Sequence, residues 1–599
     1  MFAVPDVERE ERPDGSVVFR SRIPLGPYPR SVAAMLREWA ALDPDYPLVA
    51  ERAGDGWAML GYGEARRRAD SVGQALLDRG LGPDAPLMIL SGNSAAHLVL
   101  TLGALTAGVP VAPISVAYSL LSADHARIRE IAALLRPGLV FAEEGGPFAA
   151  ALAAVSPSPL VVARDPVPGA ELFDDLLATE PGPGLEPAYA GVGPDTLAKV
   201  LFTSGSTGSP KGVLNTHRML CSNQQAIAQV WPFLAEERPV LVDWLPWSHT
   251  FGGNHNVGLV LRGGGTLYVD DGKPAPRLFA RSVENLRSAP PTLYFNVPAG
   301  YAQLVPVLEQ DAEFARVFFS RVRLLFNAAA ALPAALRERL AAVARATTGR
   351  DVVLTGSWGA TETAPCVTSA HYAFEDARCI GVPLPGLEVK LAPVGGAREI
   401  RVRGAAVTPG YLGRPEATAA AFDGDGFYRT GDAALPVDPA DPNAGLLFGG
   451  RIAEDFKLGT GTFVRVGALR TALLSAVPVL SDAVIAGEDR AHVGALAWLN
   501  QAEARALSMA EPTVADGCLV HPELAEHLAK LLAALNATAG SAGRVERLVL
   551  LAEPPDLDAG EITDKGYVNQ RQVLRRRAGI VERLYAADPG PGVILAARP

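Results

Sequence analysis

The chain has 599 residues, of which 49% are hydrophobic and 20% charged, and its formal net charge is -11. This length accommodates two or more domains, and an acidic chain without a long basic block argues against nucleic acid as the main partner. We also expect no membrane partner and a cytoplasmic location, because no apolar run is long enough to span a bilayer, the acidic amino terminus lacks the apolar segment of a secretory signal, and the four scattered cysteines form no CxxC pair.

The first 200 residues alternate helical and strand patterns. Residues 31–44 and 61–82 carry apolar side chains at helical spacing and end at proline and glycine. Short apolar runs predict buried strands at 86–92, 109–115, 137–145, 158–165 and 197–205. This alternation predicts an α/β fold. The stretch 155–195 is rich in proline, glycine and alanine, and we interpret it as a surface passage.

The pattern changes twice in the second half of the chain. Residues 386–413 predict successive short strands with turns, which form a small β-rich part. Beyond 446–461, helical patterns at 467–476 and 524–539 alternate with strand patterns at 482–489 and 494–500. We therefore expect a large amino-terminal α/β domain with several subdomains and mixed sheets at 1–449. A small, mobile α+β domain follows at 450–599, with a hinge near 451–458.

The stretch "TSGSTGSPKG" (203–212) follows an apolar strand and consists mostly of glycine, serine, threonine and lysine. Its glycines allow backbone N–H groups to approach an anion closely, and Lys211 adds a positive charge, so the loop suits a polyphosphate. It is not a Walker A loop, because Pro210 precedes Lys211 and Gly212 follows it. It contains no GxGxxG or GxSxG, and flexible linkers do not usually follow a buried strand and end in Pro-Lys-Gly.

This loop resembles the phosphate loop of the adenylate-forming superfamily, which comprises acyl-CoA synthetases, peptide-synthetase adenylation domains and luciferases. Six further segments resemble that family's motifs in the expected order: "PWSHTFGG" (246–253), "NAAAALP" (327–333), "SWGATET" (357–363), "YRTGD" (428–432), "GRIAEDFKL" (450–458) and "GEITDKGYVNQR" (560–571). The resemblance covers nearly the whole chain. It implies an enzyme that uses ATP, Mg²⁺ and coenzyme A to activate a small-molecule carboxylic acid.

The resemblance assigns roles to individual residues. The implied catalytic residues are Lys565, His249, Thr361 and Glu362, with Glu362 and Thr207 at the metal. The implied ATP-binding residues are Thr203, Ser204, Gly205, Ser206, Thr207, Gly208, Lys211, Asn327, Ala328, Ala329, Trp358, Gly359, Thr361, Asp432 and Arg451. The implied acyl pocket comprises Trp247, His249, Phe251, Asn254, Tyr294, Asn327 and Thr355.

The chemistry fits these residue types. Lys565 would bridge the carboxylate and the α-phosphate, Asp432 would accept hydrogen bonds from the ribose, and Trp358 would stack on adenine. Each also has a plain structural alternative: Glu362 exposed on a helix, Trp358 in the core, Asp432 capping a turn, His249 hydrogen-bonded in the fold, and Trp247 and Phe251 as packing residues. A calcium loop at 423–432 is rejected, because Phe427 and Tyr428 occupy positions that need an acid and a glycine.

Two positions depart from the family pattern. Ala453 stands where the hinge usually carries a charged residue, so the pivot is not assigned, and Lys565 precedes Gly566 where the usual order is Gly-Lys. The segments at 116–129, 357–365, 450–464 and 558–574 most resemble the feruloyl-CoA synthase branch, which implies a hydroxycinnamic or related aryl acid. Two alternatives stay open: an acyl-AMP ligase that loads a carrier protein, and a non-catalytic nucleotide-binding relative. We expect a monomer or homodimer.

Overall fold

The computed structural model describes residues 1–204, 210–275, 277–500, 504–505, 507–508, 510–563, 568–590 and 592–597. The chain divides into a large unit, residues 1–393, 400–430 and 436–447, and a small unit, residues 394–399, 431–435 and 448–599. The α/β class, with a large amino-terminal and a small carboxy-terminal unit, is confirmed. The boundary at 449 stays a prediction, because two short segments before it group with the small unit.

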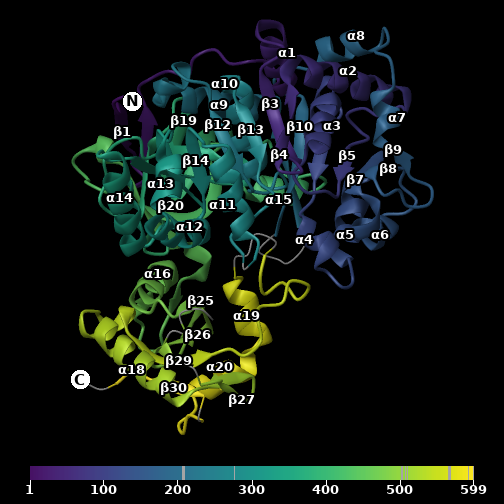
Figure 1. The fold of residues 1–599 in the computed structure, drawn as a ribbon. Helices are drawn as coiled ribbons and strands as arrows, with labels where there is room; N and C mark the ends of the chain where they lie inside the picture. Colours follow the sequence, from purple (N-terminus) through teal and green to yellow (C-terminus); the bar gives the residue numbers. More distant parts are fainter. Residues whose placement is uncertain are drawn as a thin grey trace. The chain divides into compact units, whose positions relative to one another are not determined.

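A seven-stranded sheet forms one part of the large unit (Figure 1). Its strands, in spatial order, are β11 (Pro210–Thr216), β10 (Leu197–Ser204), β6 (Val111–Pro113), β5 (Leu87–Ile89), β7 (Leu139–Glu144), β8 (Leu160–Arg164) and β9 (Glu171–Leu172). The pairs are parallel except β10 with β11, which form an antiparallel hairpin. The central strands β5 and β6 are apolar and fully buried, as expected for parallel strands covered on both faces.

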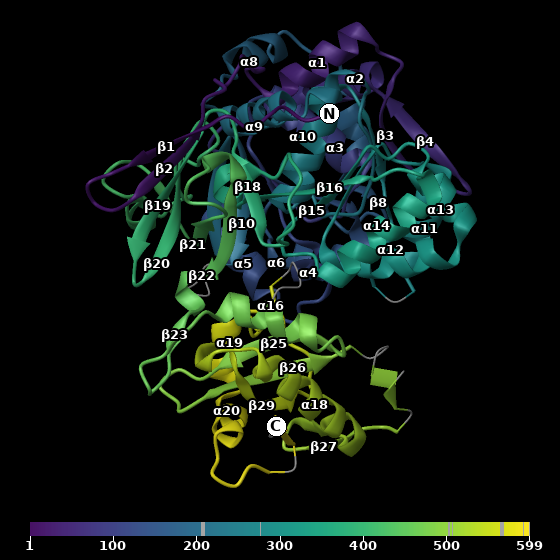
Figure 2. The ribbon, with the colours of Figure 1, turned by 90° about the vertical axis from the view of Figure 1, so that its left-hand side faces the viewer.

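A four-stranded sheet belongs to the large unit, and an eleven-stranded sheet belongs mostly to it (Figure 2). The larger one has the order β1 (Val7–Glu11), β2 (Val17–Ser21), β19 (Leu387–Val394), β20 (Ala397–Gly404), β21 (Tyr428–Pro436), β22 (Leu446–Arg451), β18 (Cys379–Pro383), β17 (Cys366–Ser369), β16 (Val353–Gly359), β15 (Leu324–Asn327) and β14 (Leu293–Asn296). The smaller one has the order β12 (Val240–Asp243), β13 (Thr266–Val269), β3 (Pro47–Ala53) and β4 (Gly56–Gly61).

Fifteen described α-helices lie in the large unit. The helices are α1 (Val32–Leu42), α2 (Tyr62–Asp78), α3 (Ala95–Thr106), α4 (Val116–Leu120), α5 (Ala126–Leu135), α6 (Gly145–Ala154), α7 (Phe173–Leu177), α8 (Leu185–Gly191), α9 (His217–Val230), α10 (Val257–Gly263), α11 (Phe279–Ser288), α12 (Pro298–Gln310), α13 (Ala312–Phe319), α14 (Ala334–Thr348) and α15 (Pro415–Ala420). Side-chain oxygens cap α1 and α9 in the usual way: Ser31 accepts from the Ala34 N–H and Thr216 from the Met219 N–H.

Two sequence-based expectations differ in outcome. The helices predicted at 31–44 and 61–82 are present as α1 and α2. The passage predicted at 155–195 instead contains β9, α7 and α8, besides the strand β8 that was predicted. These two helices are only five and seven residues long, and each buries no more than two side chains, so no sustained periodic pattern marks them.

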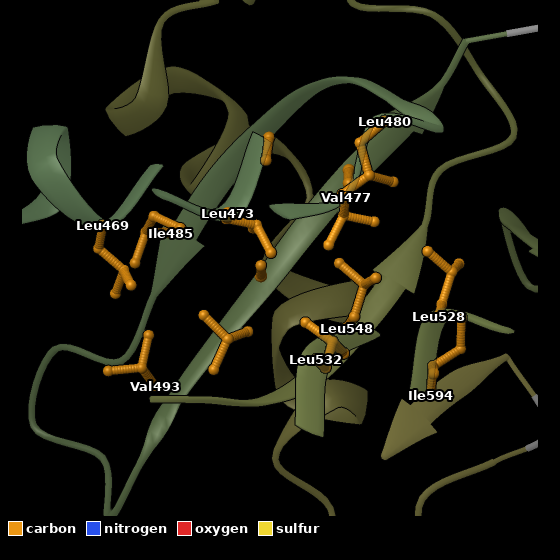
Figure 3. Close-up of a cluster of buried hydrophobic side chains, with 14 of the residues drawn as sticks. Leu469, Leu473, Val477, Leu480, Ile485, Val493, Leu528, Leu532, Leu548 and Ile594 are labelled. Atoms are coloured by element: carbon orange, nitrogen blue, oxygen red, sulfur yellow. The ribbon is translucent and has the colours of Figure 1, made fainter. Parts of the chain in front are cut away.

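The small unit packs an apolar core between a mixed sheet and two long helices (Figure 3). Its elements are β23 (Phe456–Lys457), β24 (Phe463–Val464), α16 (Val466–Ala476), β25 (Leu480–Ala486), β26 (Val493–Leu499), β27 (Thr513–Ala515), β28 (Cys518–Val520), α18 (Pro522–Ala537), β29 (Val545–Leu550), α19 (Gln570–Arg576), α20 (Ala578–Leu584) and β30 (Val593–Leu595). Leu469 and Leu473 of α16 and Leu528 and Leu532 of α18 point into this core.

All four cysteines are buried and free. Burial raises the pKa of Cys221 and Cys366 to about 12, and it also raises the pKa of Cys379 and Cys518. Among the helices that the structure describes, none is both long and apolar enough to cross a bilayer.

Candidate functional site

The predicted phosphate loop joins the two strands of the β10–β11 hairpin. Thr203 pairs with Lys211 across the hairpin, and Ser204 pairs with Pro210. Four of the predicted ligands, Gly205, Ser206, Thr207 and Gly208, lie outside the described residues. The described flanks nevertheless place Lys211 at the end of the hairpin, with its ammonium 5.3 Å from the ring centre of Tyr411. An ammonium over an aromatic face is attracted electrostatically, so the Tyr411 ring helps to hold the Lys211 side chain in place.

Glu362 lies in a one-turn 3-10 helix, Thr361–Thr363, and its carboxylate is oriented by two tyrosines. The Tyr411 hydroxyl donates to Glu362 Oε1 at 3.1 Å, and the Tyr411 and Tyr428 hydroxyls lie 3.2 Å apart. Burial and the nearby Glu362 carboxylate raise the pKa of both tyrosines far above the ordinary value, so both remain protonated. Lys211, Tyr411 and Glu362 therefore form one polar group beside the predicted phosphate loop.

The metal role of Glu362 stays a prediction. Among the described residues there is no group of three or more histidine, cysteine, aspartate or glutamate side chains that could hold a metal ion. Mg²⁺ is commonly bound by one or two carboxylates together with substrate phosphates, so a single oriented carboxylate beside a phosphate loop fits this ion. Thr361, its neighbour, is buried.

The predicted adenine-facing residues lie at the carboxyl ends of neighbouring parallel strands. Asn327 ends β15 and pairs with Gly356 of β16, and Trp358 and Gly359 end β16. Ala328 and Ala329 follow Asn327 directly. Ligands of α/β sheets commonly bind at this edge. A side chain at position 359 is excluded, because a Cβ there would lie 1.7 Å from the Pro365 carbonyl oxygen.

The "PWSHTFGG" segment (246–253) leads into a π-helix, Thr250–Asn256, that begins after His249. His249 Nδ1 accepts a hydrogen bond from the Phe251 N–H at 3.2 Å. Asn254 Nδ2 donates to Asn215 Oδ1 at 2.9 Å and to Thr250 Oγ1 at 3.1 Å. A π-helix is rare and is often found at functional sites.

Hydrogen bonds and packing also hold two more residues of the predicted acyl pocket, Trp247 and Thr355. Trp247 is buried, its backbone N–H donates to Asn93 Oδ1 at 2.9 Å, and its ring lies 5.1 Å from His97. The Thr355 hydroxyl donates to the Ala370 carbonyl at 2.5 Å.

Tyr294 is separated from the other predicted acyl-pocket residues. Its ring packs among helices α12 and α13 against Tyr301 and Phe318, and its hydroxyl accepts from Asn296 Nδ2 at 2.7 Å. Successive strand residues point to opposite faces of a sheet, so the residue of β14 on the other face is its neighbour Phe295. Phe326 pairs with Thr355 across β15 and β16, and its ring lies 5.1 Å from that of Phe295.

Sequence reasoning missed an aromatic cluster behind the π-helix. Phe251, Phe295 and Phe326 surround His255 with ring centres 5.1 to 5.7 Å from the imidazole, and Trp231 lies 6.4 Å away. Phe251 and His255 lie in the same π-helix, but Trp231, Phe295 and Phe326 come from distant parts of the chain, so no local motif marks the whole cluster. We define Trp231, Phe251, His255, Phe295 and Phe326 as the aromatic cluster.

His255 has one fixed tautomer. Asn256 Nδ2 donates to Asp243 Oδ2 at 2.9 Å, which turns Asn256 Oδ1 toward His255 Nδ1 at 2.8 Å. Nδ1 therefore carries the proton. Burial lowers the pKa of His255 to about 4, so the ring is neutral near pH 7. Its Nε2 is a buried acceptor without a hydrogen-bond partner among the described residues.

Three further predicted residues belong to the small unit. Arg451 Nε lies 3.0 Å from Asp432 Oδ1, and the Asp432 side chain is 10% exposed while that of Arg451 is 61% exposed. Lys565 lies outside the described residues. Its flanks are described: Ile562 and Val568 form an antiparallel bridge, and the buried Glu561 accepts from Arg577 Nε and Nη2 at 2.8 Å.

The chain is similar in sequence and in fold to several known proteins. A feruloyl-CoA synthase of an Amycolatopsis species is 29% identical over 390 residues, covering 63% of this chain and 72% of the relative. A long-chain-fatty-acid–CoA ligase of Mycobacterium bovis is 24% identical, covering 93% and 97%. A crystal structure of an anthranilate CoA ligase with anthranoyl-AMP has the same fold, with a TM-score of 0.71 at 19% identity over 94% of this chain and 99% of that one.

Family models match both units. A model described as AMP-binding enzyme matches residues 36–412, and one described as AMP-binding enzyme C-terminal domain matches residues 458–589. The first match alone spans more than half of the chain and includes every described site residue of the large unit except Tyr428. The chain therefore belongs to the AMP-binding enzyme family, the adenylate-forming enzymes that its motifs resemble.

Proposed function

We propose that the chain is an ATP-dependent acid–CoA ligase that activates an aryl carboxylic acid of the hydroxycinnamic, ferulate-like type. The aromatic cluster carries this proposal: flat rings from Trp231 at the end of α9, from the π-helix, from β14 and from β15 meet there, and one of them is Phe251 of the predicted acyl pocket. Planar rings pack favourably against aromatic walls, and His255 Nε2 is an acceptor suited to a phenolic hydroxyl. The feruloyl-CoA synthase among the relatives supports the same class.

The reaction has two halves. A carboxylate oxygen of the acid attacks the α-phosphorus of ATP, a new P–O bond forms, and pyrophosphate leaves. The CoA thiolate then attacks the acyl carbonyl carbon, a thioester forms, and AMP leaves. Bringing two anions together is the main barrier of the first half, so positive charge and donors at the phosphates are the catalytic requirement.

The residues of this chain would divide this work. Lys211 and the loop from Thr203 to Gly208 would hold the β- and γ-phosphates, and Mg²⁺ held by Glu362 would supply charge neutralisation there. Asp432, with Arg451, would bind the ribose, and Trp358 and Asn327 to Ala329 would face adenine. Lys565 would bridge the carboxylate and the α-phosphate. His249 would orient the acid.

The deciding experiment measures AMP and pyrophosphate release from MgATP with a panel of aryl and fatty acids, with and without CoA. We expect CoA-dependent turnover that is fastest with a hydroxycinnamate. Pyrophosphate exchange without CoA-dependent turnover would instead favour a ligase that loads a carrier protein. No exchange with any acid would favour a non-catalytic nucleotide-binding relative.

Two variants test the assigned roles within this reaction. Lys565→Ala should abolish adenylate formation but largely spare thioester formation from supplied acyl-AMP, and an equal loss of both halves would contradict the role. Glu362→Ala should raise the Mg²⁺ concentration needed for half-maximal rate, and an unchanged metal dependence would argue against metal ligation.

A further inference from the structure

Lys199 is a buried lysine in the middle of β10, four residues before Thr203. Its ammonium donates to the Gly253 carbonyl of the π-helix at 2.7 Å. The side chain borders a small cavity of about 20 Å³, about the space of one water molecule. The cavity is lined mainly by apolar residues of α1, α3, α9 and α10, such as Met35, Leu102 and Leu261.

No carboxylate faces this ammonium among the described residues that line the cavity. Thr101, Gln224 and Asn254 are its uncharged polar neighbours there. The titratable groups that interact with it are His97 of α3 and His217 of α9, and burial lowers their pKa to about 4 and about 3, so both are neutral. Burial likewise lowers the pKa of Lys199 to about 8.

A second buried contact joins the same hairpin to the same π-helix. Asn215 of β11, the other strand of the hairpin, accepts from Asn254 Nδ2 at 2.9 Å. Gly253 and Asn254 are consecutive in the π-helix, so each strand of the phosphate hairpin contacts one of two adjacent residues of the acid-binding segment. Gln224 of α9 adds a third tie, since its Nε2 donates to the Asn254 and His255 carbonyls at 3.1 Å.

These contacts hold the predicted phosphate hairpin against the predicted acid-binding segment. The hairpin ends in the predicted phosphate loop, and the π-helix carries Phe251 and begins at His249. In-line attack on the α-phosphorus depends on the distance between the acid and the phosphates, and a misplacement of about 1 Å can cost about a hundredfold in rate. Within the described residues, Lys199 is the charged donor among these contacts, and charge-assisted hydrogen bonds are roughly twice as strong as neutral ones.

We infer that Lys199 is a positioning residue of the adenylation half-reaction: its protonated side chain holds the acid-binding π-helix in register with the phosphate hairpin. This inference rests on the proposed function, which identifies the hairpin as the phosphate site and the π-helix as the acid site. Loss of the proton leaves a weaker, neutral donor to Gly253, so adenylation of the acid should fall as the amine deprotonates, while binding of MgATP alone should be little changed.

The test is pyrophosphate exchange at saturating MgATP, measured as kcat/KM for an acid that the enzyme turns over, from about pH 6.5 to about pH 9.5. We expect the kcat/KM of the unmodified enzyme to fall about tenfold as the pH rises, with a midpoint near pH 8. This factor corresponds to the difference between a charged and a neutral hydrogen-bond donor. The kcat/KM of Lys199→Met should already be about tenfold below that of the unmodified enzyme at pH 7, and it should show no fall near pH 8. Its KM for ATP should stay within about threefold.

Two further variants complete the comparison. Lys199→Arg keeps a donor whose charge is permanent, so it should retain most of the kcat/KM at pH 7 and should not show the fall near pH 8. The exposed Lys273→Met should retain both the value and the fall. A fall that persists in Lys199→Arg, or a Lys199→Met profile that matches the unmodified enzyme, would overturn the inference. If Lys199→Met does not fold, the arginine variant alone decides.

A second readout does not depend on turnover. Amide hydrogen exchange of residues 250–256 should be at least about fivefold faster in Lys199→Met than in Lys273→Met, because the Gly253 carbonyl loses its donor. Unchanged exchange would show that the contact does not hold the π-helix. Absence of turnover with every acid would refute the proposed function, whereas turnover with an unaltered pH profile in Lys199→Met would refute this inference alone.

Discussion

Two buried lysines of the large unit have opposite surroundings. Lys390 of β19 lies 2.5 Å from Asp423 and 2.9 Å from Asp425, and its ammonium is 4.5 Å from the ring centre of Phe427. The side chains of Lys390 and Asp423 are 3% and 4% exposed. Lys199 is equally hidden but has a backbone carbonyl as its partner.

The difference separates a charge that supports the fold from one that opposes it. The positive charge of Lys390 is balanced by carboxylates, and removing one partner of such a group leaves a buried charge with less compensation. Lys199 bears the full cost of desolvation, about 3 kcal/mol for a pKa lowered from 10.5 to about 8. A cost of this size beside the predicted acid-binding segment is what a positioning role would explain.

The largest expected effect is on stability at Lys390. Lys390→Met should lower the free energy of unfolding by about 4 kcal/mol, because Asp423 remains buried with Arg401 as its remaining cation. Urea unfolding followed by tryptophan fluorescence measures this in the large unit, where six of the seven tryptophans lie. A loss below about 1 kcal/mol would remove the contrast between the two lysines.

The next effect is the pH dependence of stability at Lys199. Its folded pKa lies below the unfolded value, so the cost of burying the charge is fully present below about pH 8 and disappears above about pH 10.5. From about pH 8 to about pH 10.5, the unmodified protein should therefore gain about 3 kcal/mol relative to Lys199→Met. Parallel pH profiles of the two proteins would show that burial does not lower the pKa of Lys199.

Acid should produce a smaller effect at the paired site. Burial opposes ionisation of Asp423, but hydrogen bonds from Lys390, Phe427 and Arg401 outweigh it and lower the pKa to about 2. The stability from this carboxylate is present above about pH 4 and is lost as the pH falls toward 2. The stability difference between the unmodified protein and Asp423→Asn should shrink by about 2 kcal/mol over that range. A constant difference would mean that the ion pair does not set this pKa.

The smallest effect is the control. Lys273 is exposed, so Lys273→Met should change the free energy of unfolding by less than about 0.5 kcal/mol at any pH from 4 to 10. A larger change would indicate that replacing a lysine by methionine has a general effect. The differences at Lys199 and Lys390 would then need to be corrected for it.

Much of the fold follows from local patterns. The helical spacing at 31–44 and 61–82 and the apolar runs at 86–92 and 109–115 correspond to α1, α2, β5 and β6, because in each case burial and local propensity agree. The eleven-stranded sheet does not follow in this way. Its neighbours β2 and β19 are more than 360 residues apart in the chain, so their pairing depends on tertiary contacts.

The candidate site shows the same limit. Glycine and hydroxyl residues mark the phosphate loop because its chemistry is local. Tyr294 and Phe295 are adjacent, and only the orientation of β14 determines which one faces the π-helix. Lys199 gives no local signal either, since a single lysine in an apolar strand usually occupies an exposed position, and its partner Gly253 is a glycine whose carbonyl the sequence does not distinguish.

The four buried cysteines have a practical consequence. Alkylating reagents react with thiolates, and a buried thiol with a raised pKa offers almost none near pH 7. The native cysteines should therefore react little with labelling reagents, so introduced cysteines can be labelled selectively. Cysteines placed at the exposed positions Lys273 and Lys530, one in each unit, could carry a pair of fluorophores without removal of any native cysteine. Energy transfer between them, recorded after mixing with ATP, acid and then CoA, would report whether the units reorient between the two halves of catalysis.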